Sequence, residues 1–110
     1  MKVYAMKVPS GFGLLFYKHK GLYYIKVLGT TILVYGRTVD EAFNELIKVL
    51  KDINDGIKNN EIDPATLIQK PSLSELILYL FGRVRTIIAK TRISSKYLQE
   101  VDSDLRMIHA

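Results

Sequence analysis

Few side chains in this sequence have the types and spacing that chemistry requires. His19 lies between two lysines and His109 is next to last, and neither has a second ligand at the spacing of a zinc site. Glu41 and Glu45 lie one helical turn apart, but such a pair without a basic partner usually forms a solvated face. Phosphate-binding loops, dinucleotide glycine patterns and nucleophile elbows are absent from the sequence. We therefore expect no enzymatic activity, no metal and no cofactor.

Charge is distributed in blocks along the 110 residues, whose net charge is +5. Residues 1–39 contain six lysines and arginines and no carboxylate, residues 40–63 are acidic, and residues 64–96 are basic again. Two basic zones favour a polyanionic partner for at least one of them. The alternative is that they form solvated faces, with lysines protecting sheet edges.

The composition, 48% hydrophobic and 25% charged, is that of an ordinary globular domain. The longest apolar segment, residues 73–89, contains Glu75, Arg83 and Arg85, so we expect no membrane span. The N-terminal residues alternate between polar and apolar and do not form a signal peptide. Because cysteine is absent, we expect a cytoplasmic location.

The first half of the chain predicts an α+β domain. Residues 2–8 alternate as a strand, and a hairpin turning at Gly21 follows in FGLLFYKHKGLYYIKVLG. A short β-branched run at residues 30–36 completes an antiparallel meander of three to four strands. Thr38 and Glu41 then form a capping box for an amphipathic helix that covers the sheet and ends at Asn54-Asp55-Gly56.

The second half predicts a helical segment. Residues 57–71 are a polar linker, and a strongly apolar helix begins after Ser72. Gly82 is either tolerated within that helix or separates two shorter ones. A last helix runs from Ser94 to about Ile108. The expected organisation is a domain at 1–56, a linker at 57–71 and a helical region at 72–110.

The sequence from Gly13 to Leu50 resembles the HicB antitoxin family, which has a turn ending in Gly, a YY strand and GxTxxEA opening a helix. The matching residues are Gly21, Tyr23, Tyr24, Gly36, Thr38, Glu41, Ala42 and Leu46. The chain departs from the family in having only Leu28-Gly29-Thr30 between the second and third strands. A local explanation is equally open, in which Gly36 makes a turn, Thr38 caps the helix and Ala42 packs on the sheet.

The HicB resemblance implies a partial ribonuclease-H-like βββα domain without catalysis, and a small toxin as its protein partner. The residues agree that catalysis is lost, because the strands have no carboxylates to hold a metal. A basic toxin would bind the acidic start of the helix, and the residues predicted for that contact are Asp40, Glu41 and Glu45.

Residues 87–102, IIAKTRISSKYLQEVD, fit two interpretations. They align without a gap on LAEKTGISRSYLSEIE, a pattern of lambda-repressor-like helix-turn-helix proteins, which they resemble. They depart from it at Ile88, where the pattern has Ala, and at Arg92, where the turn has Gly. The alternative is a packing helix whose apolar stripe contains Tyr97, Leu98, Val101, Leu105 and Ile108.

The helix-turn-helix resemblance implies that double-stranded DNA is a partner. Ser94 would cap the recognition helix, and the side chains nearest the base edges would be Ser95, Lys96 and Gln99, with Ser103 beyond them. Residues beside the phosphates would be Arg83, Arg85, Lys90 and Arg92.

The apolar segment predicts a two-fold homodimer, because one short helix cannot cover all of its surface. The predicted interface consists of Leu73, Leu76, Ile77, Leu80 and Phe81.

The predicted strands and helices serve two hypotheses about function. The first is a HicB-like antitoxin or orphan relative that binds a protein through its N-terminal domain and regulates transcription through DNA binding at its C-terminus. The second is a structural or interaction homodimer whose C-terminal helices form the interface and bind no nucleic acid. A weaker third interpretation is a platform for single-stranded nucleic acid. The platform would consist of Phe16, Tyr17, Tyr23, Tyr24 and Tyr35 with Lys18 and Lys26, although alternation sends about half of these aromatics into the core.

Overall fold

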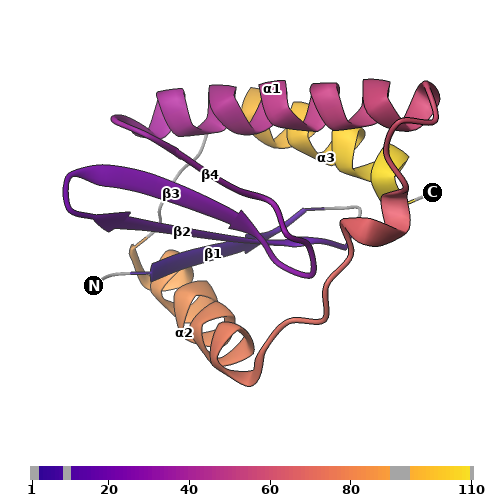
Figure 1. The fold of residues 1–110 in the computed structure, drawn as a ribbon. Coiled ribbons are helices and arrows are strands. Elements are labelled where there is room, and N and C mark those ends of the chain that lie inside the picture. The colour runs from indigo at the N-terminus through magenta and orange to yellow at the C-terminus, as the bar shows by residue number, and fades with distance from the viewer. Residues whose placement is uncertain (1–2, 9–10, 90–94, 110) are drawn as a thin grey trace.

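The computed structural model describes residues 3–8, 11–89 and 95–109; side chains at 83–89, 95, 96, 98 and 107–109 are outside that description. The fold is α+β, as the sequence predicts (Figure 1). Its strands are β1 (Val3–Lys7), β2 (Gly13–His19), β3 (Leu22–Val27) and β4 (Leu33–Gly36). Its helices are α1 (Val39–Lys58), the short 3-10 turn η1 (Pro64–Thr66), α2 (Leu73–Ala89) and α3 (Ser95–His109).

The four strands form an antiparallel meander in the order β1-β2-β3-β4. The turn between β2 and β3 has Lys20 and Gly21 at positive φ, +50° and +80°, as a two-residue hairpin requires. Successive side chains of a strand point to opposite faces, so the sheet has one face toward α1 and another toward α2. Both faces carry apolar residues, and each has its own hydrophobic cluster.

Helices α1 and α3 cover one face of the sheet, lying alongside each other (Figure 1). The core on this side joins Phe43, Leu46 and Leu50 of α1 with Val101 and Leu105 of α3, all of them at most 1% exposed. The Tyr97 ring of α3 stacks on Phe43 with centroids 5.4 Å apart and planes 9° apart. The apolar stripe predicted for the last helix is therefore a packing face in its described part.

The GxTxxEA motif has a structural role at every position that can be checked. Gly36 lies so close to α1 that an added Cβ would stand 2.5 Å from the Ala42 backbone nitrogen. The Thr38 hydroxyl accepts a hydrogen bond of 3.0 Å from the Glu41 backbone N–H, and Ala42 is fully buried. The motif therefore sets how α1 starts and how closely it packs on β4.

The predicted end of α1 at Gly56 was wrong, because the helix continues to Lys58 and is closed by Asn59. Gly56 is buried within the helix, and a side chain there would collide with Ile62 of the following loop. Here glycine provides space for the returning chain instead of ending the helix.

Helix α2 packs on the opposite face of the sheet, where it lies along β1 and reaches β2 (Figure 1). It is a single helix, so Gly82 does not separate two shorter ones. A Cβ at Gly82 would lie 3.0 Å from the Ala5 Cβ, the Ala5 nitrogen and the Tyr4 carbonyl carbon. Tyr79, one turn earlier, occupies the space that a side chain on Gly13 would need. Two glycines therefore bring α2 against the strands. Among the residues described, no helix combines the length and apolarity that crossing a membrane would take.

The contact between α1 and α3 contains a polar pair. The Asn54 side-chain amide donates a hydrogen bond of 3.1 Å to the Asp104 carbonyl, and Asn54 is 6% exposed. The side-chain oxygens Asn54 Oδ1 and Asp104 Oδ2 are buried without a hydrogen-bond partner among the described residues. Burial raises the pKa of the Asp104 carboxyl. The positive charge of Lys51 lowers this pKa, and the negative charge of Glu100 raises it.

The contact at Gly82 generates a testable prediction. Gly82→Leu should lower the free energy of unfolding by about 1–3 kcal/mol, because the added side chain has to push α2 away from the β1 backbone. Urea denaturation followed by circular dichroism measures the change. Ser74→Leu, at an exposed position of the same helix, is the matched control and should change stability by no more than about 0.5 kcal/mol. Equal stability of the two variants would contradict the close approach.

Candidate functional site

Part of the sheet face on the α2 side is not covered by a helix, because α2 lies over β1 and the adjoining part of β2. The strand register brings Tyr17 opposite Tyr24 and Tyr24 opposite Tyr35 on this uncovered part. The rings of Tyr17 and Tyr24 are stacked, with centroids 5.3 Å apart and planes 11° apart. Tyr24 and Tyr35 follow at 5.8 Å with planes 40° apart. These three residues form a tyrosine row across β2, β3 and β4.

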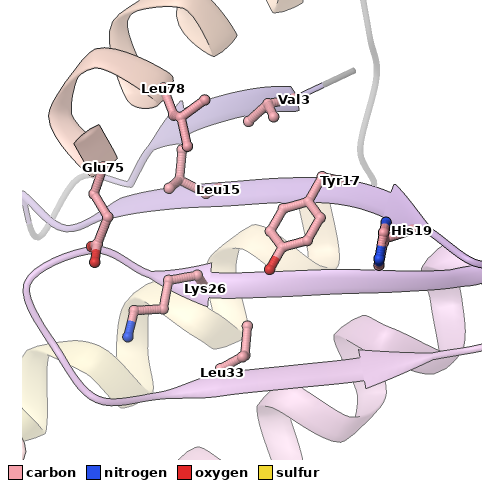
Figure 2. A pocket seen from close by; sticks show the side chains of 8 residues that line it. All are labelled: Val3, Leu15, Tyr17, His19, Lys26, Leu33, Glu75 and Leu78. Atoms are coloured by element: carbon pink, nitrogen blue, oxygen red, sulfur yellow. The ribbon is translucent and has the colours of Figure 1, made fainter. Parts of the chain in front are cut away.

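A groove of about 410 Å³ lies between the tyrosine row and α2 (Figure 2). We call it the sheet groove, and its lining residues are Val3, Leu15, Tyr17, His19, Lys26, Leu33, Glu75 and Leu78. In Figure 2 the Tyr17 side chain extends from β2 toward β3, and the Lys26 side chain runs from β3 toward the open end of the groove. The floor is the sheet itself, and Glu75 and Leu78 of α2 form one wall.

The sheet groove combines an apolar floor with mixed charges. Lys26 is paired across the strands with Leu15 and with Leu33, and Leu33 is 50% exposed at the edge strand. Glu75 is the one carboxylate among the groove-lining residues, and in Figure 2 its side chain lies at the same end of the groove as Lys26, away from His19. Burial raises the pKa of the Tyr17 phenol, and neighbouring Tyr24 raises it further, so the phenol stays neutral and can donate a hydrogen bond.

A second surface is the outward side of α2, where the predicted dimer interface lies. The five residues form what we call the α2 patch, and their exposed fractions are 74% for Leu73, 42% for Leu76, 44% for Ile77, 66% for Leu80 and 69% for Phe81. All five are thus available for contact, and Tyr79 and Gly82 occupy the side that faces the sheet.

The predicted helix-turn-helix spans the end of α2, residues 90–94 and the start of α3, and most of its side chains lie outside the description. In that motif two helices pack on each other, whereas the described parts of α2 and α3 lie on opposite faces of the sheet (Figure 1). The reason is that Tyr97, Val101 and Leu105 of α3 are taken up by the core beside α1.

The individual DNA-binding residues have different positions. Arg83 and Arg85 belong to α2, and Ser95 and Lys96 begin α3, with side chains outside the description. Lys90 and Arg92 lie outside the described residues altogether. Gln99 is exposed on α3, as the prediction requires.

The three residues predicted to bind a toxin lie in the first two turns of α1 and are exposed. They are not equally free, because Asp40 is in hydrogen-bonding contact with the Tyr97 hydroxyl of α3. Partial burial raises the pKa of the Tyr97 phenol, and Asp40 adds to that rise. Glu41 and Glu45 therefore form the more available part of the acidic surface.

No protein-family model, curated protein or solved structure matches this chain. Among the described residues, no cluster of histidines and carboxylates is arranged to hold a metal ion. The site therefore has to be interpreted from its own geometry. The sequence named Tyr17, Tyr24 and Tyr35 among five candidate platform aromatics, but it did not separate them from Phe16 and Tyr23, and it did not predict the groove. The signal that could have separated them is the strand register, which places these three tyrosines on one face.

Proposed function

We propose that the chain is a non-catalytic interaction protein that forms a homodimer through the α2 patch and binds a further partner through its remaining surfaces. The observation that carries this proposal is the exposure of Leu73, Leu80 and Phe81, at 74%, 66% and 69%. Large apolar side chains gathered on one side of a helix are typical of interfaces.

A second copy of the chain is the partner that suits the α2 patch best. The residues from Leu76 to Gly82 carry no charge, so a strongly charged partner would gain nothing from them. A two-fold interface places the same patch on both subunits, and an uncharged apolar stripe is complementary to itself. Exposed side chains such as Phe81 and Leu80 are then removed from water in the interface.

The dimer proposal predicts the effect of charge in the α2 patch. The parent chain should have twice the mass of one chain by light scattering, and the double variant Leu80→Glu with Phe81→Glu should be monomeric. The dissociation constant should rise at least about thirtyfold, the effect of losing one or more interface hot spots. Val39→Glu, an equivalent change at another exposed apolar position, is the control and should remain dimeric. A parent chain that stays monomeric at high concentration would exclude this interface.

The HicB resemblance supplies the further partner, a small basic protein such as a toxin. It is supported by the strand order, since β2, β3, β4 and α1 follow one another as the resembling segment requires. The exposed carboxylates of Glu41 and Glu45 give the start of α1 the charge that a basic partner prefers.

This toxin-binding proposal is tested by charge reversal. Glu41→Lys with Glu45→Lys should abolish co-purification with the small basic protein encoded beside this chain, because attraction becomes repulsion. Asp52→Lys with Asp55→Lys makes the same change farther along α1, at exposed positions, and should leave co-purification intact. Co-purification that survives the first pair would place the contact elsewhere.

Double-stranded DNA is the second candidate partner, and the exposed side of α3 favours it. Gln99 and Ser103 are exposed, whereas Val101 and Leu105 hold the other side of the helix in the core. In this proposal α3 is the recognition helix, and it is supported by α1 instead of by residues 83–89.

The DNA proposal predicts a loss of affinity for the gene's own upstream duplex. Lys96→Ala with Gln99→Ala should weaken binding by a few kcal/mol at most, since a good base contact is worth about 1–3 kcal/mol. Lys70→Ala with Gln69→Ala removes the same two side-chain types from the exposed connector and should have little effect. Equal affinity of the first variant and the parent, measured at fixed salt, would leave α3 as a packing helix only.

A further inference from the structure

The tyrosine row is the feature of this molecule that neither dimerisation nor toxin binding uses. Alternation assigns the other aromatics of the hairpin to the opposite face, where Phe16 and Tyr23 pack against the α1 core. Tyr24 and Tyr35 are instead on the uncovered part of the sheet, and Tyr35 is 60% exposed. The three rings, one on each of three adjacent strands, form a continuous stack that ends at Tyr35 on the edge strand β4.

The charges around this surface favour an anionic ligand. Lys26 lies in the cross-strand row next to the tyrosines, and His19 follows Tyr17 on the same face of β2. Lys20 and Arg37 are exposed directly after β2 and β4. Residues 3–39 contain no carboxylate, so Glu75 of α2 is the one acidic group lining the groove.

We propose that the tyrosine row and the sheet groove bind single-stranded nucleic acid. An unpaired base stacks on the exposed ring of Tyr35, which ends the row, and neighbouring bases pack along the edges of Tyr24 and Tyr17. Lys26, with Arg37 at the edge of the sheet, neutralises phosphates. Aromatic rings beside cations on an open antiparallel sheet are the combination by which single strands are bound with little sequence preference.

Two features of the groove select this ligand over others. Bases in a duplex have both faces covered by their neighbours, so they cannot stack on a row of rings set into a sheet. An apolar peptide would cover Lys26 without supplying a negative charge to it, and burying a cation without such a partner is unfavourable. A flexible anionic strand meets both requirements, since its bases take the apolar floor and its phosphates remain near the cations and the solvent.

The test uses the full chain and a fluorescein-labelled decauridylate, with binding followed by fluorescence anisotropy at low salt. We expect saturable binding that weakens as salt rises, and the same probe annealed to its complement should bind at least about tenfold more weakly. The chain has seven tyrosines and no tryptophan, so unlabelled decauridylate should also quench its intrinsic fluorescence as bases stack on the rings.

Tyr35 is the residue to change first, because it is the most exposed ring of the row and its loss disturbs the core least. Tyr35→Ala should weaken binding at least about fivefold, whereas Tyr35→Phe, which keeps the ring, should bind within about twofold of the parent. Lys26→Ala should reduce the slope of log affinity against log salt by roughly one phosphate contact. Lys48→Ala removes a lysine from exposed α1 and should leave the slope unchanged.

The proposal is overturned if decauridylate does not bind, if duplex binds as tightly, or if Tyr35→Ala binds as the parent does while its circular dichroism is unchanged. Uridine monophosphate that binds as tightly as the decamer would equally overturn it, in favour of a mononucleotide site. Leu80→Glu with Phe81→Glu separates this inference from the dimer, because the monomeric variant retains the tyrosine row and should still bind the decamer.

Discussion

The strands of this protein are apolar on both of their alternating faces, and the arrangement of every helix follows from the need to cover two surfaces. Helices α1 and α3 together cover one face, where the larger core lies. A single helix, α2, is left for the other face, and one helix is narrower than four strands. The uncovered remainder is where the tyrosine row and the sheet groove occur. An open surface is thus a geometric result of the unequal distribution of α1, α2 and α3 between the two faces.

The elements themselves could be predicted from the sequence because their causes are local. The alternation of polar and apolar residues predicted the strands, and Gly21 predicted the hairpin turn. The capping pair of Thr38 and Glu41 predicted the start of α1. The same local reasoning failed at Gly56, where a glycine was interpreted as a helix end. Its actual role depends on Ile62, which packs there only after the chain has turned back.

The pairing of α2 with one face and α3 with the other could not be predicted, because both helices are apolar enough to pack almost anywhere. Similarity to a known two-helix pattern in residues 87–102 concerns spacing along the chain and says little about which surface each helix meets. What decides the matter is tertiary fit: Gly82 allows α2 onto the β1 backbone, and Phe43 offers Tyr97 a ring to stack on. The members of the tyrosine row could be named as candidates but not selected for a related reason, since the three residues share a face only through the register of two hairpins.

The buried polar pair between α1 and α3 links the folding of the chain to protons. The pKa of Asp104 is higher in the folded protein than its ordinary value of 3.8, chiefly because burial disfavours the charged form. At pH values between 3.8 and the raised pKa of the folded state, the folded state binds more protons than the unfolded state. The free energy of unfolding therefore falls as pH rises through this window and is recovered as pH falls. Most carboxylates in ion pairs act in the opposite direction and favour unfolding in acid. Within that window, protonation of Asp104 removes the cost of burying its charge, so this contact stabilises the packing of α3 on α1.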